Sequence, residues 1–456
     1  MSGHVGIVHF GPGAFHRAHQ ADYVDRLLAD DPRWGIAAVS LRSAATIDAL
    51  KRQQGRYTLV ILDDAPSLRT LAAHKAFFGP GEGAAVRALL RDPAVRIVSS
   101  TVTEKGYCLA GDGTLDLDHP DIVRDLGDPA RPVGIVGWLA LGLADRKAAG
   151  RPPFTPLCCD NMVSNGRKLR AAVLAFAGRL DPELARWIEG EAVFPDTMVD
   201  SITPATDDRL RTLVRERGYD DAIPVGREAY AAWVIEDVLP PGSPDLAAAG
   251  ATMAADVGAW EQAKLRMLNG AHSALAYLGA LIGHETVAES MADPPLARFV
   301  EALVREDVAA SLAPSPLDLQ AYAGDILQRF RNPAIHHRLS QIAWDGSQKL
   351  PYRVLDTIAD ALEAGRGVGR LAVPVAAWML FVRSQARAGA EIVDPLAPVL
   401  SEAGLADDTA ERLLALRPVF PQHLADDPRF RDALLGAVHA MSEEGPRACL
   451  TEGALS

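Results

Sequence analysis

The stretch VGIVHFGPGAFHRAHQ, Val5–Gln20, carries the strongest fold signal of the chain. Its β-branched first part predicts a strand over Val5–Phe10, followed by the turn Gly11-Pro12-Gly13 and a helix. This order is typical of dinucleotide-binding folds, because one glycine permits the tight turn and the next lets a pyrophosphate approach the helix N-terminus. His16 stands where the usual fingerprint has its third glycine, so a plain strand-to-helix turn is the alternative interpretation.

Beyond this stretch, short apolar runs alternate with amphipathic ones, which favours a parallel sheet with crossover helices. Further strands are predicted over Ile36–Leu41, Tyr57–Leu62, Arg96–Thr101 and Phe154–Cys159, and helices over Ala18–Ala29, Ala84–Leu90, Pro132–Ala149 and Asn165–Leu180. After about residue 255 the pattern becomes helical, with helices predicted over Gly258–Ile282, Pro295–Ala310, Leu317–Arg331, Tyr352–Ala364, Val375–Ala388, Asp408–Leu416 and Arg429–Met441. We therefore predict an α/β plus all-α protein, with a Rossmann-like NAD(P)-binding domain over residues 1–255 and a mostly helical substrate and catalytic domain over residues 256–456.

Composition narrows the class of protein. The 456 residues are 48% hydrophobic and 23% charged, with a formal net charge of −13, and no basic stretch suggests a nucleic-acid or membrane partner. The four cysteines form no C-x-x-C pair, which is typical of free thiols in a reducing compartment. The N-terminus lacks signal-peptide features and the longest apolar runs are roughly a dozen residues. We expect a cytoplasmic protein.

Polar side chains also interrupt an otherwise apolar helix, KLRMLNGAHSALAYLG, at Lys264, Asn269 and His272. At about 100° per residue the three lie near 0°, 140° and 80°, on one side of an α-helix. Oxidation of an alcohol by hydride transfer needs a base and neutral donors for the oxygen, and Lys, Asn and His can supply both. A solvated helix face is the alternative, but Asn269-Gly270 breaks the helix pattern as functional sites often do.

At these residues the chain resembles the polyol-specific long-chain dehydrogenases, the family of mannitol 2-dehydrogenases and fructuronate reductases. The matching blocks are GPGAFHRAHQ, TVTEKGY (Thr101–Tyr107), CDNMVSNG (Cys159–Gly166), FPDTMVDSITP (Phe194–Pro204), the lysine helix and DGSQKLPYR (Asp345–Arg353). They span nearly the whole chain in the family's order, so their joint specificity is high.

The resemblance implies a role for each matched residue. Lys264 would be the general base, Asn161 and Asn269 would donate to the reacting oxygen, and His272 would hold substrate hydroxyls. Asp200 would lie beside the substrate, with Lys349, Arg353 and Arg338 as candidate partners of its far end. The implied cofactor residues are Gly11, Gly13, Ala14, Phe15, Arg17, Arg42, Thr103, Glu104 and Asn161, and no metal is implied. The cofactor would be NAD; Arg42 stands where NAD-specific folds often carry an acid, which leaves NADP open.

The substrate is less well defined by the resemblance. Mannitol-type members carry an arginine eight positions before Lys349, where this chain has Gln341, and the surrounding text is more similar to fructuronate reductases. We therefore expect interconversion of D-mannonate and D-fructuronate, with mannitol 2-dehydrogenase or another polyol dehydrogenase as the alternative and a non-catalytic nucleotide-binding relative as the alternative of another class. Many relatives are monomers, and the sequence itself does not determine the oligomeric state.

Overall fold

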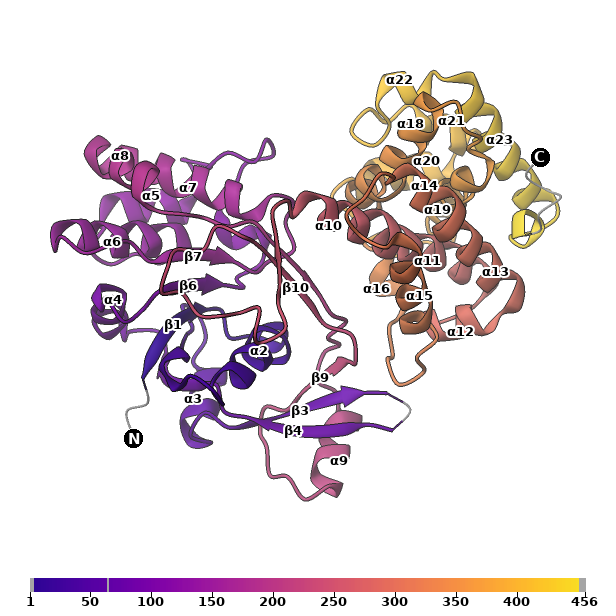
Figure 1. Cartoon of the computed structure of the whole chain (residues 1–456). Helices are drawn as coiled ribbons and strands as arrows, with labels where there is room; N and C mark the ends of the chain where they lie inside the picture. The colour runs from indigo at the N-terminus through magenta and orange to yellow at the C-terminus, as the bar shows by residue number, and fades with distance from the viewer. Residues whose placement is uncertain (1–3, 64, 451–456) are drawn as a thin grey trace. The chain divides into compact units, whose positions relative to one another are not determined.

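The computed structural model describes residues 4–63 and 65–450. The chain divides into two compact units, unit 1 (Met1–Gly258) and unit 2 (Ala259–Ser456), each shown in Figure 1. Unit 1 contains the strands that the sequence predicts, and unit 2 is helical. None of the described helices is both long and apolar enough to cross a bilayer.

The centre of unit 1 is a five-stranded parallel sheet in the order β5-β2-β1-β6-β7. Its strands, along the chain, are β1 (Val5–Phe10), β2 (Gly35–Val39), β5 (His74–Phe78), β6 (Ile97–Ser100) and β7 (Thr155–Cys158). Counted within this sheet the order is 3-2-1-4-5, which is that of a Rossmann fold. The predicted N-terminal fold class is confirmed.

Helices cover both faces of this sheet, as a parallel sheet requires. One face packs on α2 (Gln20–Leu27) and α3 (Ala45–Arg52), and the other on α4 (Gly83–Arg91), α6 (Ile135–Ala148), α7 (Asn165–Leu180) and α8 (Pro182–Glu191) (Figure 1). Alternate residues of β1 enter the two cores: Ile7 lies with the side chains of α2 and α3, whereas Val8 and Phe10 lie with those of the other helices. The central strands are thus buried on both sides.

Two small sheets complete unit 1. In one, β3 (Tyr57–Leu62) pairs with β4 (Ser67–Leu71) and β9 (Val225–Glu228); in the other, β10 (Ala232–Glu236) pairs with β8 (Thr197–Asp200) and β11 (Thr252–Ala254). The strand over Tyr57–Leu62 is therefore where the sequence predicts it, but outside the main sheet. Its apolar pattern indicates a strand and does not indicate which strand it pairs with. The remaining helices are α1 (Ala14–Ala18), α5 (Pro120–Gly127) and α9 (Asp208–Glu216).

Unit 2 is built around α11 (Gly270–Ile282) and α19 (Gly369–Arg387), which pack against each other. Around α11 lie α12 (Val287–Ala292), α13 (Pro294–Ala302) and α16 (Leu339–Ile342), and on α19 lie α20 (Ala397–Leu405) and α23 (Pro428–Glu443). The other helices are α10 (Gly258–Ala263), α14 (Ala309–Ser311), α15 (Leu319–Phe330), α17 (Gly346–Leu350), α18 (Asp356–Glu363), α21 (Thr409–Leu414) and α22 (Gln422–Ala425). The predicted helical domain is confirmed.

Three helices of unit 2 contain a π-helical segment where the sequence predicts uninterrupted α-helix. These are η3 (Lys264–Asn269), η4 (Leu303–Val308) and η5 (Pro351–Leu355). A π turn bonds residue i to i+5 and occurs mostly as a single turn within α-helices, frequently at functional sites. The apolar pattern of these segments fits an α-helix equally well, so the wider turns could not be predicted from it.

Candidate active site

The glycine turn is held between two strands of the main sheet. Gly11 has a φ of +90°, and a Cβ atom there would lie 2.1 Å from the carbonyl oxygen of Thr101. Its N–H donates to the Val39 carbonyl (2.9 Å), and its own carbonyl accepts from the Thr101 hydroxyl (2.7 Å). Only glycine fits this backbone, so Gly11 shapes the turn for the fold itself.

Gly13 has a different role, because the protein leaves space beside it. It is exposed at the N-cap of α1, and the nearest atom to an added Cβ would be 3.9 Å away. No side chain caps this helix end, whose first N–H groups have no intrahelical partner and carry partial positive charge. Together with the half-buried Ala14 and Phe15, this open turn fits the pyrophosphate of a dinucleotide.

Arg17 does not face the open side of this turn. Its guanidinium is buried, donates to the Ile223 carbonyl and lies 5.5 Å from the centre of the Tyr57 ring; burial lowers its pKa. The prediction that Arg17 contacts a phosphate is therefore wrong, because α1 directs this side chain into the core. His16 and His19 of the same stretch are buried as well.

Arg42 lies beyond the C-terminal end of β2, as the sequence predicts, and its side chain is exposed. Its guanidinium is 2.8 Å from a carboxylate oxygen of Asp121 on α5. The ion pair places a carboxylate near the strand end at which Rossmann folds bind the adenosine ribose. The positive charge of Arg42 is thus partly balanced at this position.

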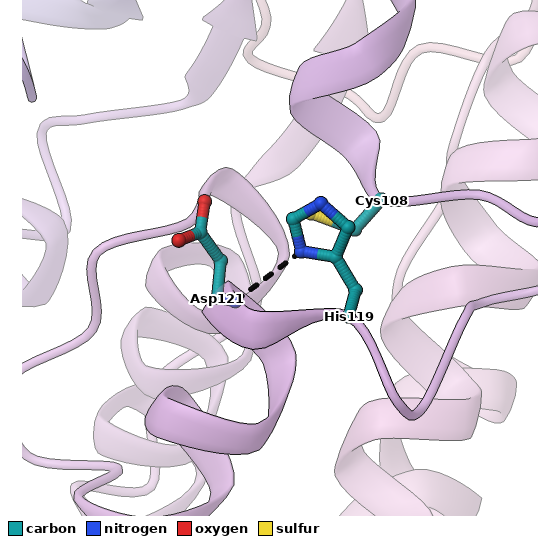
Figure 2. A group of neighbouring side chains, drawn as sticks. All are labelled: Cys108, His119 and Asp121. Atoms are coloured by element: carbon teal, nitrogen blue, oxygen red, sulfur yellow. Dashed lines mark hydrogen bonds between the residues drawn. The ribbon is translucent and has the colours of Figure 1, made fainter.

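The same corner of unit 1 contains Cys108, His119 and Asp121, whose ligand atoms lie within 4.8 Å of one another (Figure 2). The three residues do not have a metal-ligand spacing in the sequence, because the loop before α5 brings them together. Each donor has another state or partner: His119 Nδ1 accepts the Asp121 N–H (3.2 Å), Asp121 is paired with Arg42, and burial raises the pKa of the Cys108 thiol to about 11. A protonated thiol and two engaged donors suit a helix cap better than a cation.

Asp160 organises the loop that carries Thr103 and Glu104. Its carboxylate accepts from the N–H groups of Val102 (2.8 Å) and Thr103 (3.0 Å) and from the Tyr107 hydroxyl (2.6 Å). Thr103 has a φ of +68°, a strained conformation typical of binding sites, and both it and Glu104 are exposed. Asn161 follows directly and is exposed too. The resemblance implied a role for Asn161 only; that Asp160 positions its neighbours depends on contacts between separate loops, which no local sequence pattern indicates.

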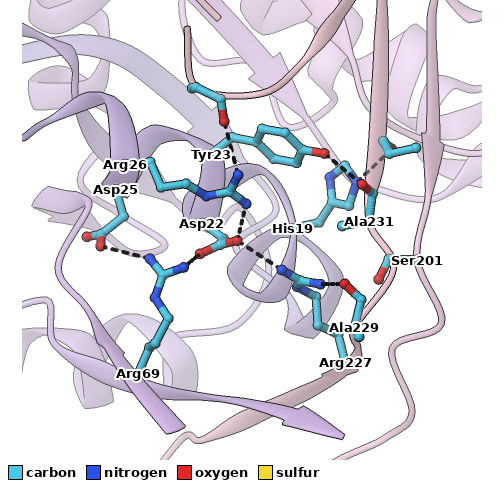
Figure 3. Close-up of polar contacts among 12 residues, drawn as sticks. His19, Asp22, Tyr23, Asp25, Arg26, Arg69, Ser201, Arg227, Ala229 and Ala231 are labelled. Atoms are coloured by element: carbon cyan, nitrogen blue, oxygen red, sulfur yellow. Dashed lines mark hydrogen bonds and ion pairs between the residues drawn. The ribbon is translucent and has the colours of Figure 1, made fainter. Parts of the chain in front are cut away.

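Asp200 is buried at the end of β8, where it pairs with Ala232 of β10. Helix α2 and the histidine before it fix the chain leading to Ala232 (Figure 3): the Tyr23 hydroxyl donates to the Ala231 carbonyl (3.1 Å), and His19 Nε2 lies 2.9 Å from that of Ala232. Helix α2 and its N-cap residue His19 therefore position the strand opposite Asp200.

An ion network anchors that helix in turn. The buried Asp22 is bound by Arg26 (2.5 Å), Arg69 of β4 (2.8 Å) and Arg227 of β9 (3.0 Å) (Figure 3). The pKa of Asp22 is lowered by these three arginines, which outweigh the opposing effect of burial. Arg227 also donates to the carbonyls of Glu228 and Ala229. The carboxylate of Asp22 thus connects α2 to strands β4 and β9 of one small sheet.

In unit 2, Lys264, Asn269 and His272 are all buried, with exposed fractions of 8%, 8% and 6%. Lys264 and Asn269 are the first and last residues of η3, one π turn apart, and so lie on the same face. The angles expected for an α-helix do not apply to this pair; the π turn aligns them more closely. The next residue is Gly270, and a larger side chain does not fit there, because a Cβ would lie 2.7 Å from the carbonyl oxygen of Arg353 in η5.

Arg353 of η5 lies against the helix that contains Asn269 and His272. Its guanidinium donates to the Ser273 hydroxyl (3.2 Å) and the Asn269 carbonyl (3.4 Å), and burial lowers its pKa to about 10. Burial also lowers the pKa of His272 well below its usual value, and His337, Arg353 and Arg329 lower it further. The imidazole is therefore neutral near pH 7, beside a charged guanidinium.

Lys349 and Arg338 have other surroundings. The Lys349 ammonium donates to the carbonyls of Ile342 and Trp344, and burial lowers its pKa. Arg338 lines a cavity of about 530 Å³ near the C-terminal end of α11, with aromatic walls that include Trp344, Trp378 and Phe381. Lys264, Asn269 and His272 do not line this cavity, so the structure does not bring Arg338 to them.

Comparisons with known proteins agree with this architecture. The model of the mannitol dehydrogenase Rossmann domain matches residues 5–247, and that of the mannitol dehydrogenase C-terminal domain matches residues 256–442. D-mannonate oxidoreductase of Escherichia coli is 40% identical over 97% of this chain and 94% of its own.

Two solved structures are similar over nearly the whole chain. A D-sorbitol dehydrogenase in substrate-free form superposes with a TM-score of 0.92, 33% identity and coverage of 99% of this chain and 96% of its own. Mannitol 2-dehydrogenase of Pseudomonas fluorescens, in ternary complex with NAD and D-mannitol, has a TM-score of 0.84, 36% identity and coverage of 98% and 94%. The chain belongs to the mannitol dehydrogenase family of NAD(P)-dependent oxidoreductases.

Proposed function

We propose that the protein is an NAD-dependent oxidoreductase that interconverts D-mannonate and D-fructuronate. The observation that carries the choice of substrate is the half-buried Arg353, whose guanidinium is held on the helix of Asn269 and His272 and whose pKa is lowered by burial. A cation partly withdrawn from water is stabilised when it meets an anion, and a sugar acid supplies a carboxylate where a polyol supplies none. The similarity to D-mannonate oxidoreductase agrees with this choice.

Lys264 is the proposed general base. It takes the proton of the substrate hydroxyl as the carbinol carbon loses its hydride, and returns it in the reverse direction. When bound, NAD(P) accepts that hydride or supplies it. Asn269, one π turn away, donates to the oxygen as it becomes negative, together with Asn161, and the neutral amides do not compete for the proton. No step is assigned to a metal ion, so dialysis against EDTA is expected to leave kcat unchanged.

His272 and Asp200 are proposed to hold substrate hydroxyls. The neutral His272 ring can donate at one nitrogen and accept at the other, and its Nε2 atom, as far as the chain is described, makes no hydrogen bond. Asp200 presents a buried carboxylate at the end of β8, which suits hydroxyl donors. Lys349 is proposed to stabilise the turn between α16 and α17, since its ammonium donates to the carbonyls of Ile342 and Trp344.

The cofactor is proposed to bind at the open turn Gly11–Phe15 and the strand ends that carry Arg42, Thr103, Glu104 and Asn161. NAD is preferred because Asp121 pairs with Arg42 (2.8 Å): a carboxylate accepts from a ribose hydroxyl and repels a 2′-phosphate. The ratio of kcat/KM for NAD over NADP is expected to exceed tenfold, which corresponds to about 1.4 kcal/mol. A preference for NADP would mean that Arg42 leaves Asp121 and meets the phosphate.

The substrate assay uses the purified full chain and follows the oxidation of NADH with D-fructuronate, D-tagaturonate and D-fructose. We expect the highest kcat/KM with D-fructuronate. A clear preference for D-fructose would overturn this proposal in favour of a mannitol 2-dehydrogenase. Absence of turnover with every ketose, in protein that binds NADH, would favour a non-catalytic relative.

A further inference from the structure

His337 lies against the imidazole of His272 and has no role implied by the family resemblance. The two ring centres are 4.9 Å apart and the planes nearly perpendicular, at 79°, while Phe330 packs on His272 with a centre distance of 4.4 Å. The backbone of His337 is held at both ends: its N–H donates to Ile335 (2.9 Å), and its carbonyl accepts from Val287 (3.1 Å). The backbone position of His337 is therefore fixed by the fold.

Both imidazoles keep one buried nitrogen without a partner. Among the described residues, His272 Nε2 and His337 Nδ1 make no hydrogen bond. Such an atom is costly in free energy if nothing meets it, and native proteins retain few of them. Two on neighbouring rings, of which His272 lies on the helix that follows Lys264 and Asn269, indicate a ligand with more than one polar group.

The charges around this pair indicate the sign of that ligand. The guanidinium of Arg353 is one hydrogen bond from Ser273, the residue after His272 (3.2 Å), and both Arg353 and Arg329 are among the groups that lower the pKa of His272. Burial alone accounts for the lowered pKa of His337, about 4, which leaves this ring neutral at pH 7. A neutral N–H donor and a guanidinium that both lie near the His272 ring suit a carboxylate.

Accordingly we propose that His337 is a specificity-determining residue: its ring donates to the carboxylate of the sugar acid whose charge Arg353 balances. The inference rests on the proposed function and deepens it. It replaces Arg338, the neighbour that the sequence analysis had named. Arg338 forms a backbone bridge with Thr286 and lines the separate aromatic cavity; adjacent side chains in extended backbone point to opposite sides.

The test measures binding by isothermal titration calorimetry, with NADH-loaded full-length protein and D-mannonate or D-mannitol as the titrant. His337→Ala is expected to weaken D-mannonate binding about tenfold or more, as for a lost hydrogen bond to a charged group, and to leave D-mannitol binding unchanged. His337→Asn, which keeps a donor near the position of Nδ1, should recover most of the affinity. His336→Ala is the matched control, because His336 is the exposed neighbour.

Equal weakening of both ligands by His337→Ala, or weakening of neither, would overturn the role of His337. Failure of the Asn variant to recover affinity, in protein with an unchanged melting temperature, would do the same. A wild-type protein that neither binds D-mannonate nor reduces D-fructuronate would instead overturn the proposed function itself.

Discussion

The two glycines at the start of the chain serve the fold and the ligand respectively. Gly11 adopts a φ of +90° and touches the Thr101 carbonyl, so the protein itself requires it. Gly13 has ordinary dihedrals and open space around its missing Cβ. What excludes a side chain at Gly13 is therefore the proposed pyrophosphate.

Gly13→Ala should consequently fold normally and bind the cofactor weakly. We expect the free energy of unfolding in urea to change by less than about 1 kcal/mol, and the affinity for NADH, measured by fluorescence titration, to fall at least tenfold. Gly11→Ala is the contrasting variant, with a loss of stability of about 1–3 kcal/mol from backbone strain. If Gly13→Ala bound NADH like the wild type, the pyrophosphate would not lie at this turn.

Three neutral histidines lie in the core behind this turn. The rings of His9 and His16 stack at 3.4 Å, and His16 Nε2 is 3.0 Å from His74 Nε2. Burial lowers the pKa of His9 and of His74 to about 3 and that of His16 well below its usual value. In the unfolded chain these rings bind protons near pH 6.5, so between about pH 6.5 and 3 the unfolded state binds more protons.

The stability of unit 1 should therefore fall with pH below about 6.5. Each histidine contributes up to about 1.4 kcal/mol per pH unit to this slope. His74→Gln keeps an amide for His16 and removes one titrating ring, so its free energy of unfolding in urea should fall less steeply between pH 6 and 4. His4→Gln, at an exposed position, is the control. Equal slopes for the His74 variant and the wild type would contradict the neutral cluster.

At the scale of elements, one carboxylate holds the loop from β6 to η2 (Glu104–Tyr107). Asp160, at the end of β7, accepts from two N–H groups and one hydroxyl of that loop. Burial raises the pKa of Asp160, and these hydrogen bonds oppose the rise. The exposed Thr103 and Glu104 are thus positioned by a residue of the neighbouring strand.

Asp160→Ala should lower the stability of the protein by about 2–4 kcal/mol, because it leaves two backbone N–H groups and a buried hydroxyl without acceptors. The affinity for NADH should fall with it, as the strained Thr103 relaxes. Asp160→Asn, which keeps one acceptor oxygen, should lie between Ala and the wild type in both measurements. Thermal unfolding and NADH titration test this; an Ala variant with unchanged NADH affinity would show that the loop does not bind the cofactor.

Most elements could be predicted from the sequence, because period and glycine turns are local signals. The helix Asn165–Leu180 and the strand Tyr57–Leu62 have the predicted bounds. The sheet to which Tyr57–Leu62 belongs and the π turn at Lys264 could not be predicted, since strand partners and an added residue per turn depend on tertiary packing. The angles used for Lys264 and Asn269 assumed an α-helix, and they do not apply to the π turn that the structure has there.

Across the whole molecule, motif spacing identified residues better than it identified their surroundings. Asn269, His272 and Arg353 come together within unit 2. Arg17 and Arg338 do not have the predicted environment, because their side chains turn into the core and toward a separate cavity. A sequence shows which charges are present, but the direction of a long side chain depends on the packing around it.

The proposed cofactor turn and the proposed base belong to different units, which makes the role of Lys264 as general base testable. The open glycine turn belongs to unit 1 and Lys264 to unit 2, so a change at Lys264 should leave NADH binding intact while removing the base.

The most direct measurement is the kcat of Lys264→Ala with D-mannonate and NAD⁺, in protein shown to bind NADH with wild-type affinity. We expect kcat to fall by a factor of about 10²–10⁴, the usual contribution of a general base. A variant that retained most of the wild-type turnover would contradict the assignment of Lys264 as the base.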